Sequence, residues 1–288
     1  MIWQCRDYHL DCSRTLLMGV LNLTPDSFSD GGRFVDPSKA INQAFQMVQE
    51  GADILDLGGE STRPGAQAVS VEEELRRIIP VLDPLKGKIP IPISVDTTKP
   101  EVADICLQKG ADIINDVSGL KDSGGPMAAL IKAYGAGIVL MHRRGNPLTM
   151  QTLTQYEDVV SEVLRELKES CQIAERAGID PSQIAIDPGL GFAKTAEQNC
   201  EMIRNLERFQ VLNRPILLGP SRKSFIGKII GREANEREMG TAAVCAVAVT
   251  KRVNILRVHE IGRMRDVVLM AEAIRGGDYV RAFKMGKY

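Results

Sequence analysis

The feature that most constrains this chain is a series of eight short apolar runs, each ending on a polar or charged side chain. The runs are near-continuous rather than alternating, as expected of parallel strands that are covered by helices outside and packed inside. Their last polar residues, in chain order, are Asn22, Asp56, Asp96, Asn115, His142, Asp187, Ser221 with Lys223, and Arg257 with His259. Eight such strands separated by helical stretches predict an α/β fold, a (β/α)8 TIM barrel with its site across one rim.

Between these runs, apolar residues recur with helical spacing. After Asp36-Pro37, a favourable helix start, they stand at positions 40, 41, 44, 45 and 48, which is one face of a helix. Ser70-Val71-Glu72-Glu73 fits a capping box before the next helix. Apolar spacing also predicts a helix over residues 156–171, stopping near Gly178, and a last amphipathic helix over residues 265–274. A helix therefore fits in nearly every gap, as crossovers between parallel strands require.

The length of 288 residues suits one domain of this class, because α/β barrels take about 250 residues as a single unit. We expect a short N-terminal extension over residues 1–13 and the barrel domain over residues 14–288, since no linker divides the chain. The loops after the first two strands, from Asn22 and from Gly58, are long and rich in glycine and hydroxyl groups. This composition favours mobile flaps that close over a ligand, although solvated turns share it.

Composition excludes some partners and locations. A formal net charge of -1 at pH 7 gives no global attraction to nucleic acid or to a membrane surface, so an anionic ligand needs a local cluster. Six cysteines are scattered without a CxxC motif, which indicates reduced thiols and a cytoplasmic location. No apolar segment has the length of a signal peptide or a membrane span.

Four basic side chains follow the last two predicted strands. Arg222 and Lys223 come after the seventh run, and Arg257 and His259 end the eighth. Because Arg257 and His259 are two residues apart, both point to one face if the strand continues through them. Solvated surface cations would give the same pattern, but the loops after strands seven and eight are the usual anion site of this fold. The cluster predicts an anionic ligand and cations able to stabilise a departing phosphate.

Carboxylates and an amide end four other strands, at Asp56, Asp96, Asn115 and Asp187. Side chains at the ends of different strands converge in a barrel and can present acceptors and donors to a flat heterocycle. Aspartate accepts two hydrogen bonds from an amino-pyrimidine edge, and asparagine both donates and accepts. Each residue alone could instead cap the following helix. The four together favour a ligand site.

Neither covalent catalysis nor a zinc site is indicated. Three histidines give no zinc triad, and no Ser/His/Asp relay is suggested. His142 stands beside Arg143 and Arg144, so bonds to neighbours explain it as well as a ligand does, and its role stays open. Phe192, in a glycine-rich loop, could line a pocket or simply pack. The chemistry that the sequence favours is positioning and charge stabilisation.

Together these motifs resemble those of the dihydropteroate synthase family, the pterin-binding TIM barrels of the folate pathway that sulfonamide drugs target. The resemblance runs from about residue 14 to the last helix and rests on seven motifs in order. They are GVLNLTPDSFSDGG at 19–32, GADILDLGGESTRPGA at 51–66, SVDTTKP at 94–100, INDVSG at 114–119, IDPGLGFAK at 186–194, GPSRKSFIG at 219–227 and ILRVHE at 255–260. The segment HRRGNP at 142–147 departs by looking more basic than the common form.

The resemblance implies a transferase that condenses (7,8-dihydropterin-6-yl)methyl diphosphate with 4-aminobenzoate to give 7,8-dihydropteroate and diphosphate. It also implies a Mg2+ cofactor and a homodimer. The pterin methylene can lose diphosphate to leave a delocalised cation, an SN1-like step, so stabilisation of the leaving group is the main requirement. The arylamine is neutral at physiological pH and needs no strong base. A missing catalytic relay agrees with this chemistry.

Matching motifs imply particular roles. The implied pterin diphosphate site comprises Thr62, Asp96, Asn115, Asp187, Lys223, Arg257 and His259. The implied 4-aminobenzoate pocket comprises Thr62, Arg63, Pro64, Phe192 and Ser221, with Arg63 on the moving flap. Asn22 is the implied Mg2+ ligand and contacts the diphosphate. The implied catalytic residues are Asp96, Lys223, Arg257 and His259.

Two other interpretations remain. A related barrel that passes a methyl group from methyltetrahydrofolate to a corrinoid protein would share the Asp96 and Asn115 pocket, but needs neither an aminobenzoate flap nor a diphosphate cluster. A non-catalytic pterin-binding regulatory barrel would tolerate loss of the leaving-group cations. The segments Ser61-Thr62-Arg63-Pro64 and Ser221-Arg222-Lys223 favour the synthase.

Overall fold

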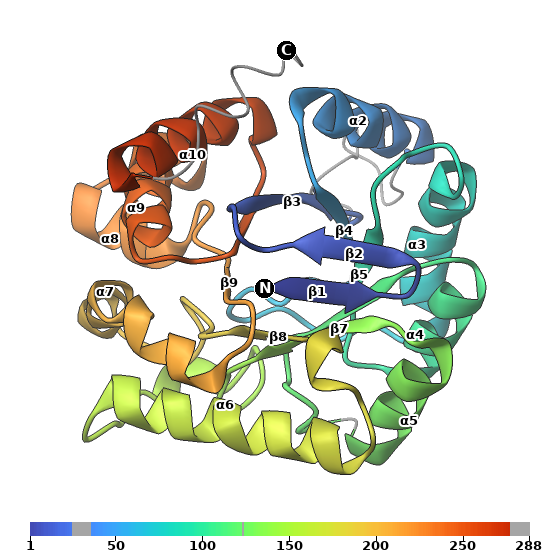
Figure 1. Cartoon of the computed structure of the whole chain (residues 1–288), viewed down its shortest axis with the longest axis horizontal. Helices are drawn as coiled ribbons and strands as arrows, with labels where there is room; N and C mark the ends of the chain where they lie inside the picture. Colours follow the sequence, from blue (N-terminus) through green and yellow to red (C-terminus); the bar gives the residue numbers. More distant parts are fainter. Residues whose placement is uncertain (25–35, 123, 277–288) are drawn as a thin grey trace.

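The computed structural model describes residues 1–24, 36–122 and 124–276. Within these ranges eight parallel strands form a barrel with helices around it (Figure 1). The barrel strands are β3 (Leu16–Asn22), β4 (Ile54–Gly58), β5 (Ile93–Asp96), β6 (Ile113–Asp116), β7 (Gly137–Met141), β8 (Ile184–Asp187), β9 (Leu217–Leu218) and β10 (Ile255–Val258). The predicted TIM barrel is confirmed.

The barrel closes between β8 and β9. Paired neighbours follow the order β8-β7-β6-β5-β4-β3-β10-β9, and a bridge between Ile186 and Ile216 joins the two ends. β9 is shorter than the predicted run, because Pro220 has no N–H for a ladder and Arg222 has a left-handed φ of 58°. Ser221 and Lys223 therefore lie in the turn that follows the strand.

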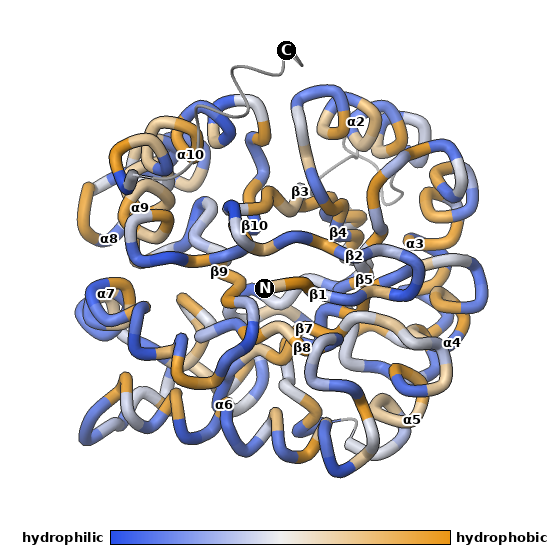
Figure 2. Tube along the Cα trace, in the orientation of Figure 1, coloured by the Kyte–Doolittle hydropathy of each residue, from blue (hydrophilic) through white to orange (hydrophobic). Residues whose placement is uncertain are grey.

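Helices cover the outside of the barrel, and Figure 2 shows that the strands inside it are largely hydrophobic while the helices carry hydrophilic stretches. The helices are α2 (Pro37–Glu50), α3 (Val71–Leu85), α4 (Pro100–Gln108), α5 (Gly124–Tyr134), α6 (Val159–Arg176), α7 (Ala196–Arg204), α8 (Ser224–Ile230), α9 (Glu238–Thr250) and α10 (Ile261–Arg275). In the part of the chain that the structure describes, no helix combines the length and the apolar character that a membrane crossing needs.

The predicted helix starts are confirmed at α2 and α3. The Asp36 side chain caps α2 by accepting from the Ser38 amide at 2.9 Å. The Ser70 hydroxyl accepts from the Glu73 amide at 3.2 Å at the start of α3. The Glu73 carboxylate accepts from Arg76 and Arg77, each at 2.8 Å, instead of returning to the Ser70 amide as the predicted capping box requires. Only the first half of the capping box is therefore observed.

The other predicted helices differ mainly at their ends. α6 begins at Val159, since Asp158 caps it and Tyr156 lies before it. α10 begins at Ile261, four residues before its predicted start. Glu260 makes no side-chain cap there, so the sequence carried no start signal for this helix.

Residues before 14 form a hairpin of β1 (Ile2–Cys5) and β2 (Tyr8–Asp11), which lies across the end of the barrel that faces the viewer in Figure 1. Trp3 is fully buried and packs with strand residues such as Met18 and Val139. Its indole N–H donates to the Gln183 carbonyl at 2.8 Å. The hairpin therefore closes the amino-terminal end of the barrel and leaves the carboxyl ends of the strands as the open mouth.

Candidate active site

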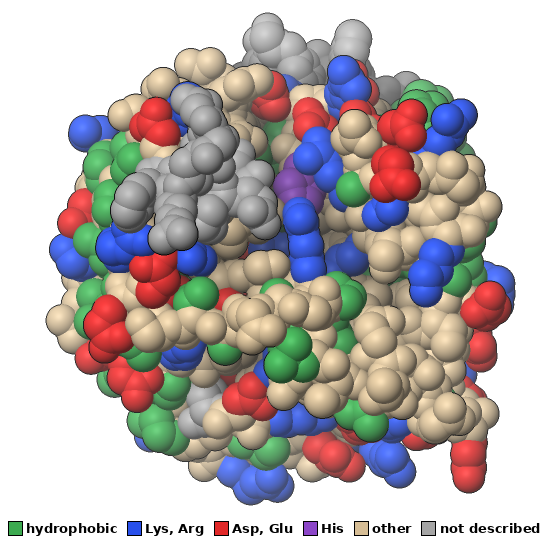
Figure 3. Space-filling view, turned by 180° about the vertical axis from the view of Figure 1, so that it is seen from behind, with side chains coloured by type: hydrophobic (Ala, Val, Ile, Leu, Met, Phe, Trp, Pro, Cys, Tyr) green, Lys and Arg blue, Asp and Glu red, His purple; other side chains and the backbone are tan. Residues whose placement is uncertain are grey.

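The polar side chains predicted at the strand ends gather at the open mouth. Figure 3, seen from behind the hairpin, shows Lys and Arg side chains and a histidine beside one another near the middle of this face. Asp56, Asp96, Asn115 and Asp187 are all buried there; they lie in β4, β5, β6 and β8, with Asp96 and Asp187 as the last residues of their strands. The fold thus brings together residues that are far apart in the sequence.

Arg257 is the centre of this cluster. Its Nε donates to Asp56 Oδ2 at 2.6 Å, and its Nη2 donates to Asp96 Oδ2 at 2.9 Å. Burial alone would lower the pKa of Arg257, but the charges of Asp56 and Asp96 offset burial and raise it. The guanidinium is therefore a fixed positive charge whose direction two carboxylates determine.

Several acceptors beside Arg257 are buried with hydrogen-bonding capacity to spare. Among the described residues, Asp56 Oδ1, Asn115 Oδ1 and Ser94 Oγ have no hydrogen-bond partner. The Asn115 amide donates weakly to Asp56 Oδ2, at 3.4 Å. Burial raises the pKa of Asp96 to about 7 despite the opposing charge of Arg257. Because an unpaired buried polar atom costs about 1–3 kcal/mol, this group is suited to receive donors from a ligand.

Asp187, Lys223 and Phe192 form a second part of the mouth. Asp187 Oδ1 accepts from the Gly189 amide at 2.7 Å, and burial raises the pKa of Asp187. The Lys223 ammonium lies 4.2 Å from the centre of the Phe192 ring, within cation–π range. Burial lowers the pKa of Lys223 to about 8, and the charge of Asp187 opposes that shift. A carboxylate and a cation thus lie within electrostatic range of each other, with the Phe192 ring beside the cation.

His259 links the ends of β3, β9 and β10. Its Nδ1 lies 2.8 Å from Ser221 Oγ and its Nε2 lies 3.3 Å from Asn22 Nδ2. Burial, then the charges of Arg222 and Arg257, lowers the pKa of His259 to about 3. His259 was grouped with the cations from sequence, but it is neutral here at pH 7, because it shares a buried site with true cations. It offers a hydrogen bond rather than a charge.

Arg222 also differs from the predicted cluster. Its guanidinium donates to Glu260 at 2.6 Å, so a carboxylate already balances its charge. The cations that remain at the centre of the mouth, within the described ranges, are Arg257 and Lys223. The predicted group of four basic side chains is thus reduced to two central cations and two flanking groups.

Ser221 and His259 stand in the geometry of a nucleophile and its base, a pair that the sequence did not suggest. The second ring nitrogen of His259 faces the Asn22 amide rather than a carboxylate, and the low pKa of about 3 makes the imidazole a weak base. An activated serine needs a base poised near neutral pH. The pair therefore orients hydrogen bonds instead of generating an alkoxide.

Thr62, Arg63 and Pro64 lie on the loop between β4 and α3, where Arg63 and Pro64 are exposed and Thr62 is half-buried. The charge of Arg63 contributes to the lowered pKa values of both Lys223 and His259. The flap predicted after the first strand falls mainly on residues 25–35, which lie outside the described residues. Arg63 on the second loop is therefore close enough to the mouth for its charge to act on Lys223 and His259.

The base of this second loop is fixed by ion pairs that the sequence did not reveal. Lys99 donates to Glu60 at 2.5 Å and to the fully buried Glu74 at 2.6 Å. The Gly65 amide donates to the Pro147 carbonyl at 2.9 Å, so the loop also rests on the segment after β7. Glu74 lies on the apolar face of α3, three residues after Val71 and four before Ile78. This position was the one sign in the sequence that Glu74 is buried.

The basic segment after β7 binds neighbours. His142 is buried and its Nε2 lies 3.1 Å from Glu166. Arg143 is paired with Asp122. Arg144 donates to Glu162 at 2.8 Å and to Glu166 at 2.6 Å. Of the two explanations left open by the sequence, hydrogen bonding to neighbours is the observed one.

Comparisons with known proteins agree with this site. Residues 18–259 match the pterin-binding enzyme family. A dihydropteroate synthase of Synechocystis sp. is 49% identical over 262 residues, covering 91% of this chain and 90% of that protein. A dihydropteroate synthase structure from Clostridium difficile, determined with pteroic acid, has a TM-score of 0.85 at 44% identity and covers 91% of this chain and 97% of that one.

A second solved structure, Xanthomonas albilineans dihydropteroate synthase with 4-aminobenzoic acid, has a TM-score of 0.88 at 41% identity. It covers 96% of this chain and 99% of that one. Agreement in sequence, fold and length over nearly the whole chain leaves one assignment. This chain belongs to the pterin-binding enzyme family and, within it, to the dihydropteroate synthases.

Proposed function

We propose that the barrel mouth condenses (7,8-dihydropterin-6-yl)methyl diphosphate with 4-aminobenzoate, giving 7,8-dihydropteroate and diphosphate. Family membership supports this reaction, as do relatives solved with pteroic acid and with 4-aminobenzoic acid, since pteroic acid joins a pterin to aminobenzoate. The observation that carries the proposal is Arg257, a cation that Asp56 and Asp96 hold beside buried acceptors.

The buried acceptors suit the edge of a pterin. Its amino and ring N–H groups would donate to Asp96 and Asp187, and Asn115 would accept through its unpaired Oδ1. Lys223 would donate to a ring oxygen or nitrogen, and Arg257 would cover the face of the ring. Thr62 would reach the same ligand from the second loop. These buried groups gain hydrogen-bond partners only when a ligand is bound. They therefore favour the polar edge of a pterin over an apolar ring.

The reaction needs charge stabilisation where the leaving group departs. The bond between the methylene carbon and the diphosphate oxygen breaks, and its electron pair leaves with diphosphate. The amine nitrogen then forms the new bond to carbon and loses a proton. Arg257 and Lys223 would stabilise the growing negative charge. Because the Asn22 amide N–H2 faces His259 Nε2 in this structure, His259 would donate a hydrogen bond to the diphosphate after that amide turns away and Ser221 donates to Nδ1. The aspartates would thus orient the substrate, while Arg257 and Lys223 would assist the departure of diphosphate.

A Mg2+ ion fits this site as a partner of the substrate. In the described ranges no group of three or more His, Cys, Asp or Glu side chains could hold a metal by itself. Mg2+ is commonly bound by one or two protein oxygens together with phosphates and water. Asn22 at the end of β3 offers a hard amide oxygen beside His259. Mg2+ would neutralise diphosphate charge there and so weaken the bond that breaks.

The aminobenzoate would lie between Phe192, Ser221 and the second loop. Thr62, Arg63 and Pro64 would complete its pocket, and closure of the loop would keep water from capturing the cation. Aminobenzoate carries a carboxylate, for which the exposed Arg63 is a matching charge.

We predict that Pro64→Ala and Thr62→Ala change the affinity for 4-aminobenzoate or a sulfonamide more than the affinity for a pterin. The reason is that both residues lie on the loop between β4 and α3, whereas the carboxylates lie on the barrel strands. Titration calorimetry with each ligand measures the two affinities separately. Equal effects on both ligands would refute this division of the pocket.

The rival interpretations are less well supported. A methyltetrahydrofolate-dependent methyltransferase releases no diphosphate and so does not need the two cations Arg257 and Lys223. A non-catalytic barrel would not need to keep them either. The relatives at 43–49% identity are dihydropteroate synthases. Neither alternative is favoured.

We also propose a homodimer that forms through α8, α9 and α10. This side of the barrel exposes large apolar side chains: Ile229, Ile230, Met239, Val247, Met270 and Ile274. Contiguous exposed apolar surface is typical of interaction sites, and the predicted packing of α9 on the barrel leaves its outer face available. Light scattering of the wild type and of Val247→Glu measures this: a dimer that becomes monomeric is expected, and a monomeric wild type refutes it.

For location, we propose the cytoplasm. All six cysteines are free, and five of them are buried, as suits a reducing compartment. Fractionation of cells that express the chain would place it, and recovery outside the cytoplasm would contradict the proposal.

Release of diphosphate tests the reaction itself. Purified protein with pterin diphosphate, 4-aminobenzoate and Mg2+ should form diphosphate and dihydropteroate in equal amounts. Removal of Mg2+ with a chelator should lower the rate, and restored Mg2+ should recover it. Demethylation of methyltetrahydrofolate without diphosphate release would reverse the assignment in favour of the methyltransferase.

A further inference from the structure

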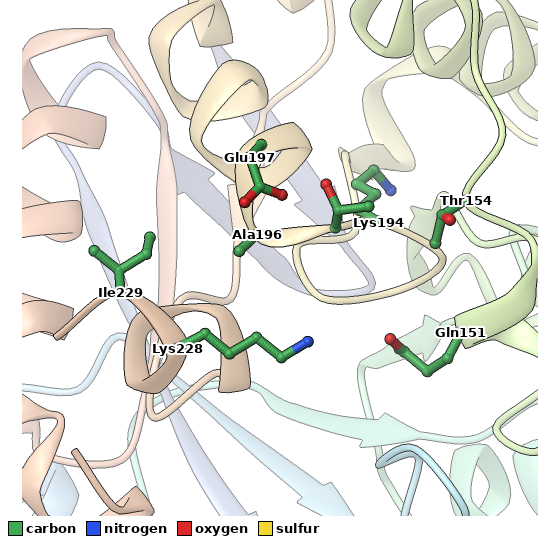
Figure 4. A pocket seen from close by; sticks show the side chains of 8 residues that line it. Gln151, Thr154, Lys194, Ala196, Glu197, Lys228 and Ile229 are labelled. Atoms are coloured by element: carbon green, nitrogen blue, oxygen red, sulfur yellow. The ribbon is translucent and has the colours of Figure 1, made fainter. Parts of the chain in front are cut away.

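Lys194 is a buried lysine with no role in the account above, and burial lowers its pKa to about 7. Only 4% of it is exposed, although it borders a pocket with Gln151, Thr154 and Lys228 (Figure 4). Its ammonium group lies 3.0 Å from His142 Nδ1, 3.0 Å from the Gly189 carbonyl and 3.1 Å from the Phe192 carbonyl. A lysine ammonium has three donors, so the charged form meets one acceptor for each of them.

The hydrogen bonds continue to a carboxylate. Because Lys194 donates to His142 Nδ1, the imidazole proton lies on Nε2, which donates to Glu166 at 3.1 Å. Burial, then the charge of Lys194, lowers the pKa of His142 to about 3, so the ring is neutral. Arg144 and Lys121 also donate to Glu166, at 2.6 and 2.9 Å. The charge of Asp187, and then that of Glu166, thus favours the protonated form of the buried lysine.

Two of the three acceptors belong to the backbone of the loop over residues 188–193. This loop crosses His142 so closely that a Cβ on Gly189, where φ is +71°, would lie 2.0 Å from the His142 carbonyl. Gly189 also donates to Asp187, at 2.7 Å. Phe192, at the other end of the loop, lies beneath the Lys223 ammonium. Lys194 therefore holds the loop at the residue next to the carboxylate site and again at the aromatic wall.

We infer that Lys194 is a positioning residue for 4-aminobenzoate, which fixes Phe192 by holding the carbonyls of Gly189 and Phe192 against His142. The inference rests on the proposed function and goes beyond it by giving a role to His142 and the basic segment after β7. The backbone of Asp187 is held by β8, and only its carboxylate contacts this loop, by accepting from the Gly189 amide. Loss of Lys194 should therefore affect the aminobenzoate pocket more than the pterin site.

The test is Lys194→Met, which keeps most of the length of the side chain and removes its donors. Loss of hydrogen bonds from a charged donor to the loop should raise the KM for 4-aminobenzoate about tenfold. The KM for pterin diphosphate should change less than about threefold, because Asp187 stays on its strand. Both are measured in the diphosphate-release assay, and pterin affinity by calorimetry shows that the protein is folded.

Lys121→Met is the matched control. It removes a cation from the same Glu166 carboxylate, at a side chain that is 37% exposed, and both KM values should stay within about twofold. If Lys194→Met does not fold, Lys194→Gln, which keeps two N–H donors, should give a smaller rise in the aminobenzoate KM alone.

Three outcomes separate the claims. A wild type without dihydropteroate formation defeats the proposed function itself. An active wild type whose Lys194 variants leave the aminobenzoate KM unchanged, or change both KM values equally, overturns the positioning role. An effect of Lys121→Met as large as that of Lys194→Met also overturns it. The rise in KM would then come from a changed charge at Glu166 and not from release of the loop.

Discussion

Arg257→Ala should lower kcat by about 100- to 1,000-fold, the loss typical when one preorganised donor to a developing negative charge is removed. The structure gives the reason: Asp56 and Asp96 aim the guanidinium from 2.6 and 2.9 Å, so no reorganisation is needed when the leaving group departs. Steady-state kinetics of diphosphate release measure the change.

The loss of catalysis should exceed any loss of folding stability. Removal of Arg257 leaves two buried carboxylates without their cation, which is costly if they stay ionised. The pKa of Asp96 is already about 7, however, so it can take up a proton instead. Thermal melting checks this, and Arg222→Gln, which changes a rim arginine already paired with Glu260, should lower kcat far less. A folded Arg257→Ala variant with near-normal turnover would count against the assignment.

Asp96→Asn should weaken pterin binding by roughly 10- to 150-fold, because it removes a hydrogen-bonded ionic partner worth about 1.5–3 kcal/mol. Asp96 lies at the end of β5 and is buried beside Arg257. The change keeps the size of the side chain, so binding of a pterin by calorimetry reports the lost acceptor. An unchanged pterin affinity would contradict the edge assignment.

Asp116→Asn is the comparison for this variant. Asp116 is also buried at a strand end, one position after Asn115, but its carboxylate accepts from Ser118 at 2.6 Å and from the Leu120 amide at 2.9 Å. It closes a turn rather than facing the ligand group. We expect Asp116→Asn to lower the melting temperature and to leave pterin affinity nearly unchanged.

The sequence predicted the barrel because its strands are continuous apolar runs whose last residues are polar. Arg257 and His259 both lie at the mouth, but β10 ends at Val258, so the expected continuation of the strand through His259 is wrong. The run from Pro215 likewise overstated β9, because a proline and a left-handed residue end the ladder early. Local pattern fixes which residues reach the mouth, but not how long each strand is.

Pairings and charge states were not predictable in the same way. The bond between Arg257 and Asp56 joins residues 201 positions apart, and nothing local selects that partner. His259 is basic as a residue type, but burial beside cations makes it neutral. Lys194 and Glu74 read from sequence as ordinary charged residues, and only the packing around them shows that both are buried. These features depend on the assembled barrel.

The most direct test of the central claim, that cations at the mouth remove diphosphate before the amine attacks, is isotope exchange without aminobenzoate. Pterin diphosphate is labelled with a heavy oxygen isotope at the bridge between the methylene and the diphosphate, and is incubated with enzyme and Mg2+. Reversible departure predicts that the label moves to non-bridging positions in recovered substrate, and that Arg257→Ala abolishes this movement. Normal turnover with 4-aminobenzoate, but a label that stays in the bridge, would contradict the account.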